Sequence, residues 1–266
     1  MSRDLMHSAE VKDLVRTAYR HVPPTTAAVA HKLYSPEELA GVPPSAVQRA
    51  LGVANHVRFA DIASGETILD IGCGGGIDTI LAAQRTGPTG HVIALDFLPE
   101  MLERTASAAH QAGLANVRTL DGEMEAIPLP DASVDLIISN GVINLSARKA
   151  RVMAECARVL RPGGRLCVSD LTVEQDDLPP EILTQPAAWA GCVAGALAEG
   201  DFARKLERSG FRDVEVLNRE PLSIDDCALY PLFSDHVIQL MKRLLPPEKH
   251  GAVAVAVVIR ASLPAS

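Results

Sequence analysis

The sequence has few aromatic residues, which make up 3% of the chain and include a single tryptophan. It also has no long apolar run, and the longest, residues 252–259, is too short to cross a bilayer. Residues 1–12 mix charged and apolar side chains and do not resemble a signal peptide. These absences predict a soluble protein, which we expect in the cytoplasm.

Clustered metal ligands are also missing. The cysteines form no Cys-x-x-Cys pair and no group with histidine, so we expect no zinc or other metal site. Their odd number favours a reducing compartment. They are Cys73, Cys156, Cys167, Cys192 and Cys227.

The chain has no block of like charges, and its net charge is −8. An acidic surface repels phosphate backbones and anionic lipids, so neither a nucleic acid nor a membrane is an expected partner. We expect a small-molecule substrate instead. The sequence leaves the formation of a homodimer open.

From residue 67 onward, short apolar runs alternate with helical patterns, which is typical of βαβ units and a parallel sheet. Helices are predicted at residues 78–86, 99–112, 147–160 and 202–209. Strands are predicted at residues 67–71, 91–96, 117–120, 134–139, 165–169, 214–217 and 252–259.

Both flanking regions are predicted to be helical. Residues 1–60 contain two Pro-Pro breaks and would cover the opening of the α/β domain, which we place at residues 61–266. Within that domain, residues 171–200 contain small apolar helical pieces and are predicted to form a cap.

A glycine-rich turn follows the first predicted strand, with glycines at 72, 74 and 76. Glycines there let a ligand approach the backbone closely. A dinucleotide site would require a third glycine at position 77, which is isoleucine. Asp70 precedes the turn, where a carboxylate would repel a pyrophosphate but would suit a ligand with an ammonium and a sulfonium group. S-adenosyl-L-methionine fits that description.

The next strand ends also carry suitable side chains. Asp96 is placed to accept both ribose hydroxyls, although a helix cap before Pro99 is an alternative role. Phe97 and Met101 could enclose an adenine or simply pack in the core. Glu123 could accept from the adenine amino group or be an ordinary surface carboxylate.

Asn140 ends the fourth predicted strand, and Asp170 ends the fifth. Ligands of doubly wound sheets bind outside the carboxyl ends of the strands, so the side chains at the first four strand ends should share one crevice. Asp170 could act as a base or orient an acceptor, and capping a loop is an equal alternative. The agreement of four strand ends outweighs any single motif.

Several segments resemble class I S-adenosylmethionine-dependent methyltransferases over about residues 67–217. They are DIGCGGG, HVIALD followed by PEML, GEMEAIPLPDASVDLIISN and ECARVLRPGGRLCVSD. The resemblance implies a Rossmann-like, seven-stranded, mostly parallel sheet in which the last strand, residues 252–259, is antiparallel.

Within that class the chain is most similar to the arsenite methyltransferase branch. The segments that carry this similarity are YSPEELAGVPP, LGVANHVRFADIASGETILDIG, SNGVINLS and AWAGCVAGAL. The resemblance implies that Tyr19 lies near the sulfonium. It also implies a cofactor site formed by Asn55, Asp70, Gly72, Gly74, Asp78, Asp96, Phe97, Met101, Glu123, Met124 and Asn140.

The chain departs from that branch at its thiols. The arsenite enzymes hold As(III) with converging cysteines, since a soft centre requires soft ligands. This chain has Val53, Thr79 and Gly141 where that branch usually has cysteine, and Cys192 alone stands in a matching context. Cys227 could join it, but its match is not evident. One thiol cannot hold arsenite, so we predict a small organic acceptor.

The candidate catalytic residues are Tyr19, Asn144, Asp170 and Cys192, and buried packing is the alternative role for Cys192. A general base is not essential, because the sulfonium is already electrophilic and alignment alone can supply about 7–11 kcal/mol. Three other hypotheses remain. They are arsenite methylation by an atypical thiol set, cyclisation of the cofactor itself with release of methylthioadenosine, and a binding module without activity.

Overall fold

A seven-stranded sheet forms the centre of the computed structural model, which describes residues 8–20, 22–174 and 178–265. The strand order is β3-β2-β1-β4-β5-β7-β6, and only β7 runs antiparallel to its neighbours. The predicted mostly parallel sheet with an antiparallel last strand is confirmed. The strands are β1 (Thr67–Ile71), β2 (His91–Asp96), β3 (Val117–Asp121), β4 (Val134–Asn140), β5 (Leu160–Thr172), β6 (Arg212–Leu222) and β7 (Ala254–Ser262).

Helices cover both faces of the sheet. One face packs against α5 (Ile77–Thr86) and the short helix η1 (His56–Phe59), and the other against α7 (Lys149–Val159) and α10 (Glu199–Arg208). Helix α6 (Pro99–Gln111) packs beside β2 and β3. Because both faces are covered, the central strands are continuous apolar runs, which is why the sequence located them well.

Side chains along β1 alternate between the two faces of the sheet, and this alternation determines which way Asp70 points. Ile68 packs in the cluster with α5 and η1, whereas Leu69 and Ile71 pack in the cluster with α7 and α10. Asp70 has the parity of Ile68 and therefore faces α5. Its side chain is 2% exposed and accepts a hydrogen bond from Thr79 of that helix.

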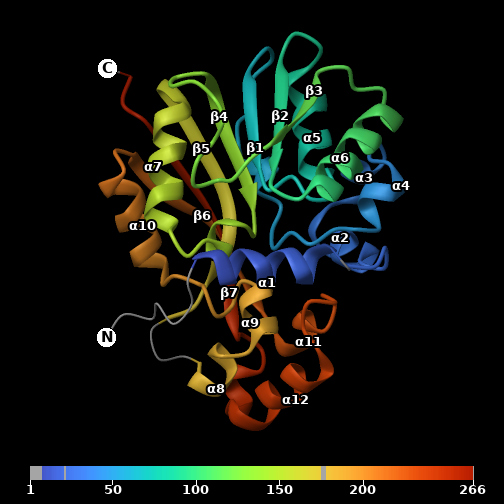
Figure 1. Cartoon of the computed structure of the whole chain (residues 1–266), viewed down its shortest axis with the longest axis vertical. Coiled ribbons are helices and arrows are strands. Elements are labelled where there is room, and N and C mark those ends of the chain that lie inside the picture. Colours follow the sequence, from blue (N-terminus) through green and yellow to red (C-terminus); the bar gives the residue numbers. More distant parts are fainter. Residues whose placement is uncertain (1–7, 21, 175–177, 266) are drawn as a thin grey trace.

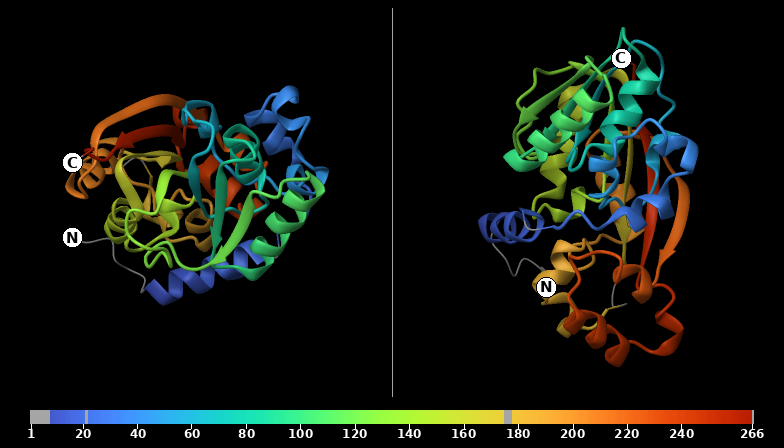
Figure 2. Two further views of the ribbon diagram at one scale, coloured as in Figure 1. Left: turned by 90° about the horizontal axis from the view of Figure 1, so that it is seen from above. Right: turned by 90° about the vertical axis from the view of Figure 1, so that its right-hand side faces the viewer.

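The N-terminal segment lies across the carboxyl ends of the strands. It contains α1 (Ser8–Arg20), α2 (Ala27–Leu33), α3 (Pro36–Leu39) and α4 (Pro44–Val47). Figures 1 and 2 show α1 passing between the sheet and a group of short helices on its other side. Residues 1–7 and 21 of the predicted cover lie outside the described residues.

That group of short helices, here called the helical lobe, comes from two separate segments. The first contains α8 (Pro180–Leu183) and α9 (Pro186–Ala190) and follows β5. The second lies between β6 and β7 and contains α11 (Ile224–Cys227), α12 (Asp235–Leu244) and the turn η3 (Pro247–Lys249). The sequence indicated only the first segment. The predicted cap began at residue 171, which still belongs to β5, and its residues 175–177 lie outside the described part.

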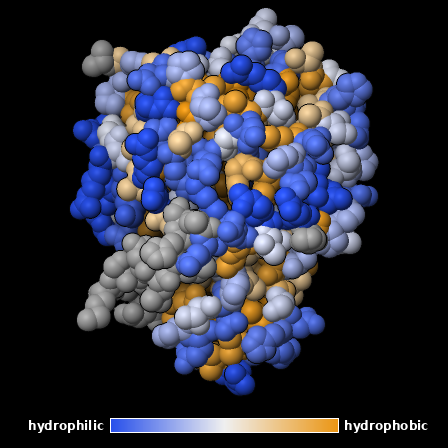
Figure 3. Space-filling view, in the orientation of Figure 1, coloured by the Kyte–Doolittle hydropathy of each residue, from blue (hydrophilic) through white to orange (hydrophobic). Residues whose placement is uncertain are grey.

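Hydrophilic residues form most of the surface seen in Figure 3, and hydrophobic residues appear in smaller groups among them. Within the described residues, no helix is both long enough and apolar enough to cross a membrane.

Candidate functional site

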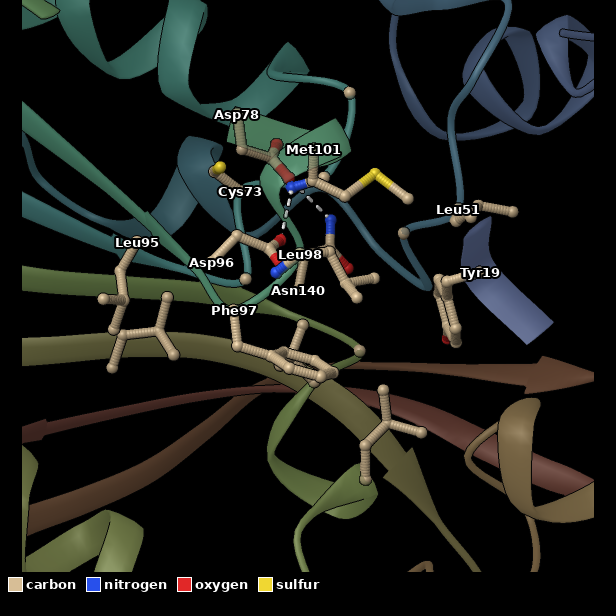
Figure 4. A pocket seen from close by; sticks show the side chains of 18 of the residues that line it. Tyr19, Leu51, Cys73, Asp78, Leu95, Asp96, Phe97, Leu98, Met101 and Asn140 are labelled. Atoms are coloured by element: carbon tan, nitrogen blue, oxygen red, sulfur yellow. Dashed lines mark hydrogen bonds between the residues drawn. The ribbon is translucent and has the colours of Figure 1, made fainter. Parts of the chain in front are cut away.

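A large cavity opens at the carboxyl ends of β1, β2 and β4 and reaches the loop after β3. We call it the main cavity. The glycine turn and the strand ends form one wall, and Lys12, Val15 and Tyr19 of α1 form another. Figure 4 shows Asp96, Phe97 and Asn140 around its centre, with Tyr19 and Leu51 at one side. The strand ends therefore meet in one crevice.

Gly72 and Gly74 of the glycine turn both have a positive φ, and a side chain would meet different surroundings at each of them. Gly72 has φ +75°, and a Cβ there would lie 2.5 Å from the Val142 side chain. Gly74 has φ +52°, and a Cβ there would contact only the backbone carbonyl of Gly72, at 3.9 Å. A larger side chain at 74 would therefore project into the main cavity that the turn lines.

Asp96 supports the start of α6 and also faces the main cavity. Its carboxylate accepts hydrogen bonds from the backbone N–H of Leu98 (3.0 Å) and of Gly74 (3.2 Å), which ties the start of α6 to the glycine turn. It also lines the main cavity. Burial raises the pKa of Asp96 to about 6. Its remaining lone pairs are available to two hydroxyl donors, as in a ribose.

Apolar side chains occupy the neighbouring part of the cavity, where Phe97, Met101 and Met124 line the wall. The guanidinium of Arg16 on α1 lies 5.6 Å from the centre of the Phe97 ring. Glu123 lines the same region and forms an ion pair with Lys12, with 2.5 Å between Nζ and Oε2. A flat aromatic ligand would thus have apolar faces beside it and a carboxylate at its edge.

A partly buried hydrogen-bond network forms the other end of the cavity. Asn140 donates to Asp78 (2.9 Å), and the hydroxyl of Tyr34 donates to the other oxygen of Asp78 (2.7 Å). All three residues line the cavity. The sequence reasoning missed Tyr34, although it begins the first of the segments that resemble the arsenite branch. A carboxylate fixed in this way can hold an ammonium group.

Two expected wall residues lie elsewhere in the structure. Asp70 is absent from the lining of the main cavity because strand alternation turns it toward α5, and burial together with the charge of Asp78 raises its pKa to about 8. Asn55 also lies outside the lining and donates to Glu38 instead (3.0 Å). The carboxylate that does reach this end of the cavity is Asp78.

A second, smaller cavity adjoins the main one and shares Tyr19, Leu51 and Gly141 with it. We call it the second cavity. Cys192 lines it and donates from its thiol to the backbone carbonyl of Gly141 (3.0 Å). Val53 also lines it, so positions 53, 141 and 192 converge, whereas Thr79 lies beneath the glycine turn against Asp70.

Asn144 and Asp170 form a buried pair that lines neither cavity. Asp170 accepts from the backbone N–H (2.9 Å) and the side-chain amide (2.8 Å) of Asn144, and from the N–H of Leu171 (2.8 Å). Burial raises the pKa of Asp170 to about 6. The pair fixes the turn η2 (Ile143–Leu145) against the end of β5.

The remaining cysteines do not supplement Cys192. All five are free and buried. Cys227 lies on α11 outside both linings, and Cys73 belongs to the glycine turn in the main cavity. Within the described residues, no group of three or more histidine, cysteine, aspartate or glutamate side chains is arranged to hold a metal ion.

Comparison with known proteins agrees with this geometry. Residues 62–210 match the family model described as methyltransferase domain. An arsenite methyltransferase of Halobacterium salinarum is 40% identical over 187 residues, which cover 70% of this chain and 47% of that protein. The human arsenite methyltransferase is 30% identical over 196 residues, which cover 69% of this chain and 52% of that protein. The chain thus spans about half the length of the curated relatives it matches.

Solved structures show the same relationship. The crystal structure of an arsenic(III) S-adenosylmethionine methyltransferase from Chlamydomonas reinhardtii has a TM-score of 0.64 and 31% identity, covering 91% of this chain and 74% of that one. A putative methyltransferase from Bacillus halodurans, at 19% identity and a TM-score of 0.66, covers 79% of this chain and 97% of its own, and shares the fold. The chain therefore belongs to the S-adenosylmethionine-dependent methyltransferases of class I and is related to the arsenite methyltransferases among them.

Proposed function

We propose that the protein transfers a methyl group from S-adenosyl-L-methionine to a small organic acceptor. The observation that carries this proposal is the pair of adjoining cavities separated by Tyr19, Leu51 and Gly141. The larger has the features that an adenosyl amino acid requires, and the smaller has a single thiol, Cys192, among its described lining residues.

The main cavity has suitable residues for each part of this cofactor, namely its ribose, its adenine and its ammonium group. Asp96 would accept from the ribose hydroxyls, Phe97 and Met101 would pack against the adenine, and Asp78 would pair with the ammonium. Bound there, S-adenosylmethionine would supply an electrophilic methyl group, with its sulfur as the leaving atom. Helix α1 forms one wall of this cavity, and Tyr19, which lines both cavities, would lie between the cofactor and the acceptor.

The walls of the second cavity contain no carboxylate, imidazole or amine among the described residues, so no general base is built into it. Catalysis would then rest on alignment, which can supply on the order of 7–11 kcal/mol. Asn144 and Asp170 act here as positioning residues, because both side chains are hydrogen-bonded within the fold and reach neither cavity.

Calorimetry with S-adenosylhomocysteine tests the cofactor site. The wild type should bind, and Gly74→Arg should not, since the new side chain would fill the cavity. Gly251→Arg is the matched control, because a Cβ at Gly251 meets nothing within 4 Å and the residue is exposed. If the wild type does not bind S-adenosylhomocysteine, the proposal is wrong. Methylthioadenosine formed without any acceptor would point instead to cyclisation of the cofactor.

Arsenite methylation is the second candidate, favoured by the relatives and by the convergence of Val53, Gly141 and Cys192 on one cavity. It requires As(III) to be held by this one thiol and by thiols that the substrate brings. Methylated arsenicals formed from arsenite should then disappear in Cys192→Ser and persist in Cys156→Ser, which alters a buried thiol on α7. No methylated arsenical from the wild type would exclude this candidate, and equal activity of the two variants would exclude a role for Cys192 in it.

A further inference from the structure

The second cavity lies where a methyl acceptor would meet the cofactor, yet its walls come from parts of the chain far apart in sequence. Leu171 is on β5, Cys192 follows α9, and Tyr230 and Phe233 lie between α11 and α12 of the helical lobe. We propose that this cavity is the acceptor site and that it takes a small, uncharged, largely apolar compound with one hydrogen-bond donor. The inference rests on the proposed function.

The composition of the walls excludes ions. Among the described residues that line the second cavity there is no lysine, arginine, histidine, aspartate or glutamate. An ion placed there would lose its hydration without a counter-charge, which costs far more than the burial of a neutral molecule. Leucine, valine and phenylalanine side chains form most of the surface.

The protic groups of the cavity are themselves neutral. Burial raises the pKa values of Tyr19 and Cys192 well above their ordinary values and also raises that of Tyr230. All three therefore keep their protons at neutral pH. None of them supplies a charge to which an ionic acceptor could bind.

The hydroxyl protons of the two tyrosines and the thiol proton of Cys192 are all donated to backbone carbonyls. Tyr19 donates to the carbonyl of Ala190 (2.9 Å), Tyr230 to that of Gly52 (2.9 Å), and Cys192 to that of Gly141 (3.0 Å). A hydroxyl that donates in this way still has lone pairs. The cavity thus offers hydrogen-bond acceptors to a ligand, which favours a compound that carries a donor such as a hydroxyl.

Side chains of the helical lobe pack closely around the second cavity. The ring of Phe233 lies over Gly191, where a Cβ would come within 2.2 Å of the ring. Leu232 forms the adjacent wall, whereas Leu229 of the same segment is 37% exposed and lines neither cavity. An enlarged side chain at 232 should therefore fill the site, and the same change at 229 should leave it open.

The test uses the whole protein saturated with S-adenosylhomocysteine and three probes of similar size, namely phenol, benzoate and benzylamine. Ligand-observed NMR should show phenol binding at least about tenfold more tightly than either ion. Leu232→Trp should abolish phenol binding, and Leu229→Trp should preserve it. Tyr230→Phe should weaken the binding of phenol but not that of toluene, a fourth probe that has no hydroxyl. The affinity for S-adenosylhomocysteine should be unchanged in all three variants, which verifies that they fold.

The inference is overturned if benzoate or benzylamine binds as well as phenol, or if phenol binds Leu232→Trp as it binds the wild type. Failure of the proposed function has a different signature, because S-adenosylhomocysteine then does not bind. The phenol titration on the protein alone still reports on the second cavity in that case.

Discussion

Lys12 on α1 and Glu123 in the loop after β3 form an ion pair across the main cavity, with 2.5 Å between Nζ and Oε2. Glu125 lies 3.6 Å from the same ammonium. Arg20, at the end of the helix, pairs with Glu100 at 2.8 Å. The helix is thus held over the cavity at two points, by carboxylates of the loop after β3 and by Glu100 in the first turn of α6.

Lys12→Gln should loosen α1 and speed the dissociation of S-adenosylhomocysteine by roughly two- to fivefold at low salt, since partly exposed ion pairs contribute about 0.2–1 kcal/mol. The difference should vanish in 1 M salt, because ions screen the pair. Stopped-flow measurement checks both statements. Arg204→Gln, which removes an exposed pair with Asp201, is the control. An equal rate in wild type and Lys12→Gln at low salt would contradict a role for this pair.

Asp96 should make the affinity for S-adenosylhomocysteine depend on pH. Hydroxyl donors favour the ionised carboxylate, and burial raises the pKa of Asp96 to about 6. Affinity is therefore expected to be constant above that pH and to fall by about tenfold per unit below it. Asp96→Asn should weaken binding by roughly 10–100-fold at pH 7.5, the size expected for hydrogen bonds to a charged group.

Calorimetric titrations between pH 5 and pH 8 give both results. The Asn variant should have a flat profile over this range if Asp96 is the titrating group. A profile that keeps its slope in the variant would assign the effect to another residue.

Asp70 should make the protein without cofactor less stable as the pH rises. Its folded pKa of about 8 lies above the ordinary value of 3.8, because burial and the charge of Asp78 disfavour ionisation. A raised carboxyl pKa contributes stability that is present below the unfolded pKa and is lost as the pH rises through the folded one. Wild type should therefore lose stability relative to Asp70→Asn from pH 5 to pH 8, by at most about 1.4 kcal/mol per unit.

The asparagine in that variant can still accept from Thr79, so the comparison isolates the charge. Thermal unfolding without cofactor measures the difference, and Asp131→Asn is the exposed control, with a side chain 79% exposed. A constant difference between wild type and Asp70→Asn over this range would show that Asp70 does not titrate there.

The sequence predicted the strands well because each central strand is buried on both faces and is therefore apolar throughout. It predicted that Asp96 and Asn140 would face one crevice, as they do in the structure, because the carboxyl ends of parallel strands share one edge. It misplaced Asp70, since a continuous apolar run does not reveal which face each residue takes. Only the structure shows that Ile68 faces α5 and that Leu69 faces the opposite side, and hence which way Asp70 points.

The helical lobe was harder for another reason. Helices α8, α9 and α11 are too short to show a repeating apolar face. Helix α12 does have an amphipathic pattern and a serine cap, Ser234, and the sequence reasoning missed this signal. The second cavity depends on Tyr230 and Phe233 from that region meeting Tyr19 from the other end of the chain. Such a meeting is a property of the tertiary fold and has no local pattern.

Asn140 should tolerate no negative charge. Its side-chain oxygen accepts from the N–H of Val53 (2.8 Å) and its amide donates to the carbonyl of Ala54 (2.8 Å) and to Asp78 (2.9 Å). Asn140→Asp keeps the shape but replaces the donor by an acceptor, which then faces a carbonyl and a carboxylate.

We expect Asn140→Asp to lower the free energy of unfolding by about 1–2 kcal/mol, because a partly buried charge would lie beside the carboxylate of Asp78 and the lost donor would leave two acceptors facing each other. Binding of S-adenosylhomocysteine should fall below detection, since the oxygen of Asp78 opposite Tyr34 would no longer be fixed. Denaturant unfolding and calorimetry measure the two effects, with Asn218→Asp near the surface as the control. If the variant unfolds and binds like the wild type, the hydrogen bond between Asn140 and Asp78 does not organise this end of the cavity.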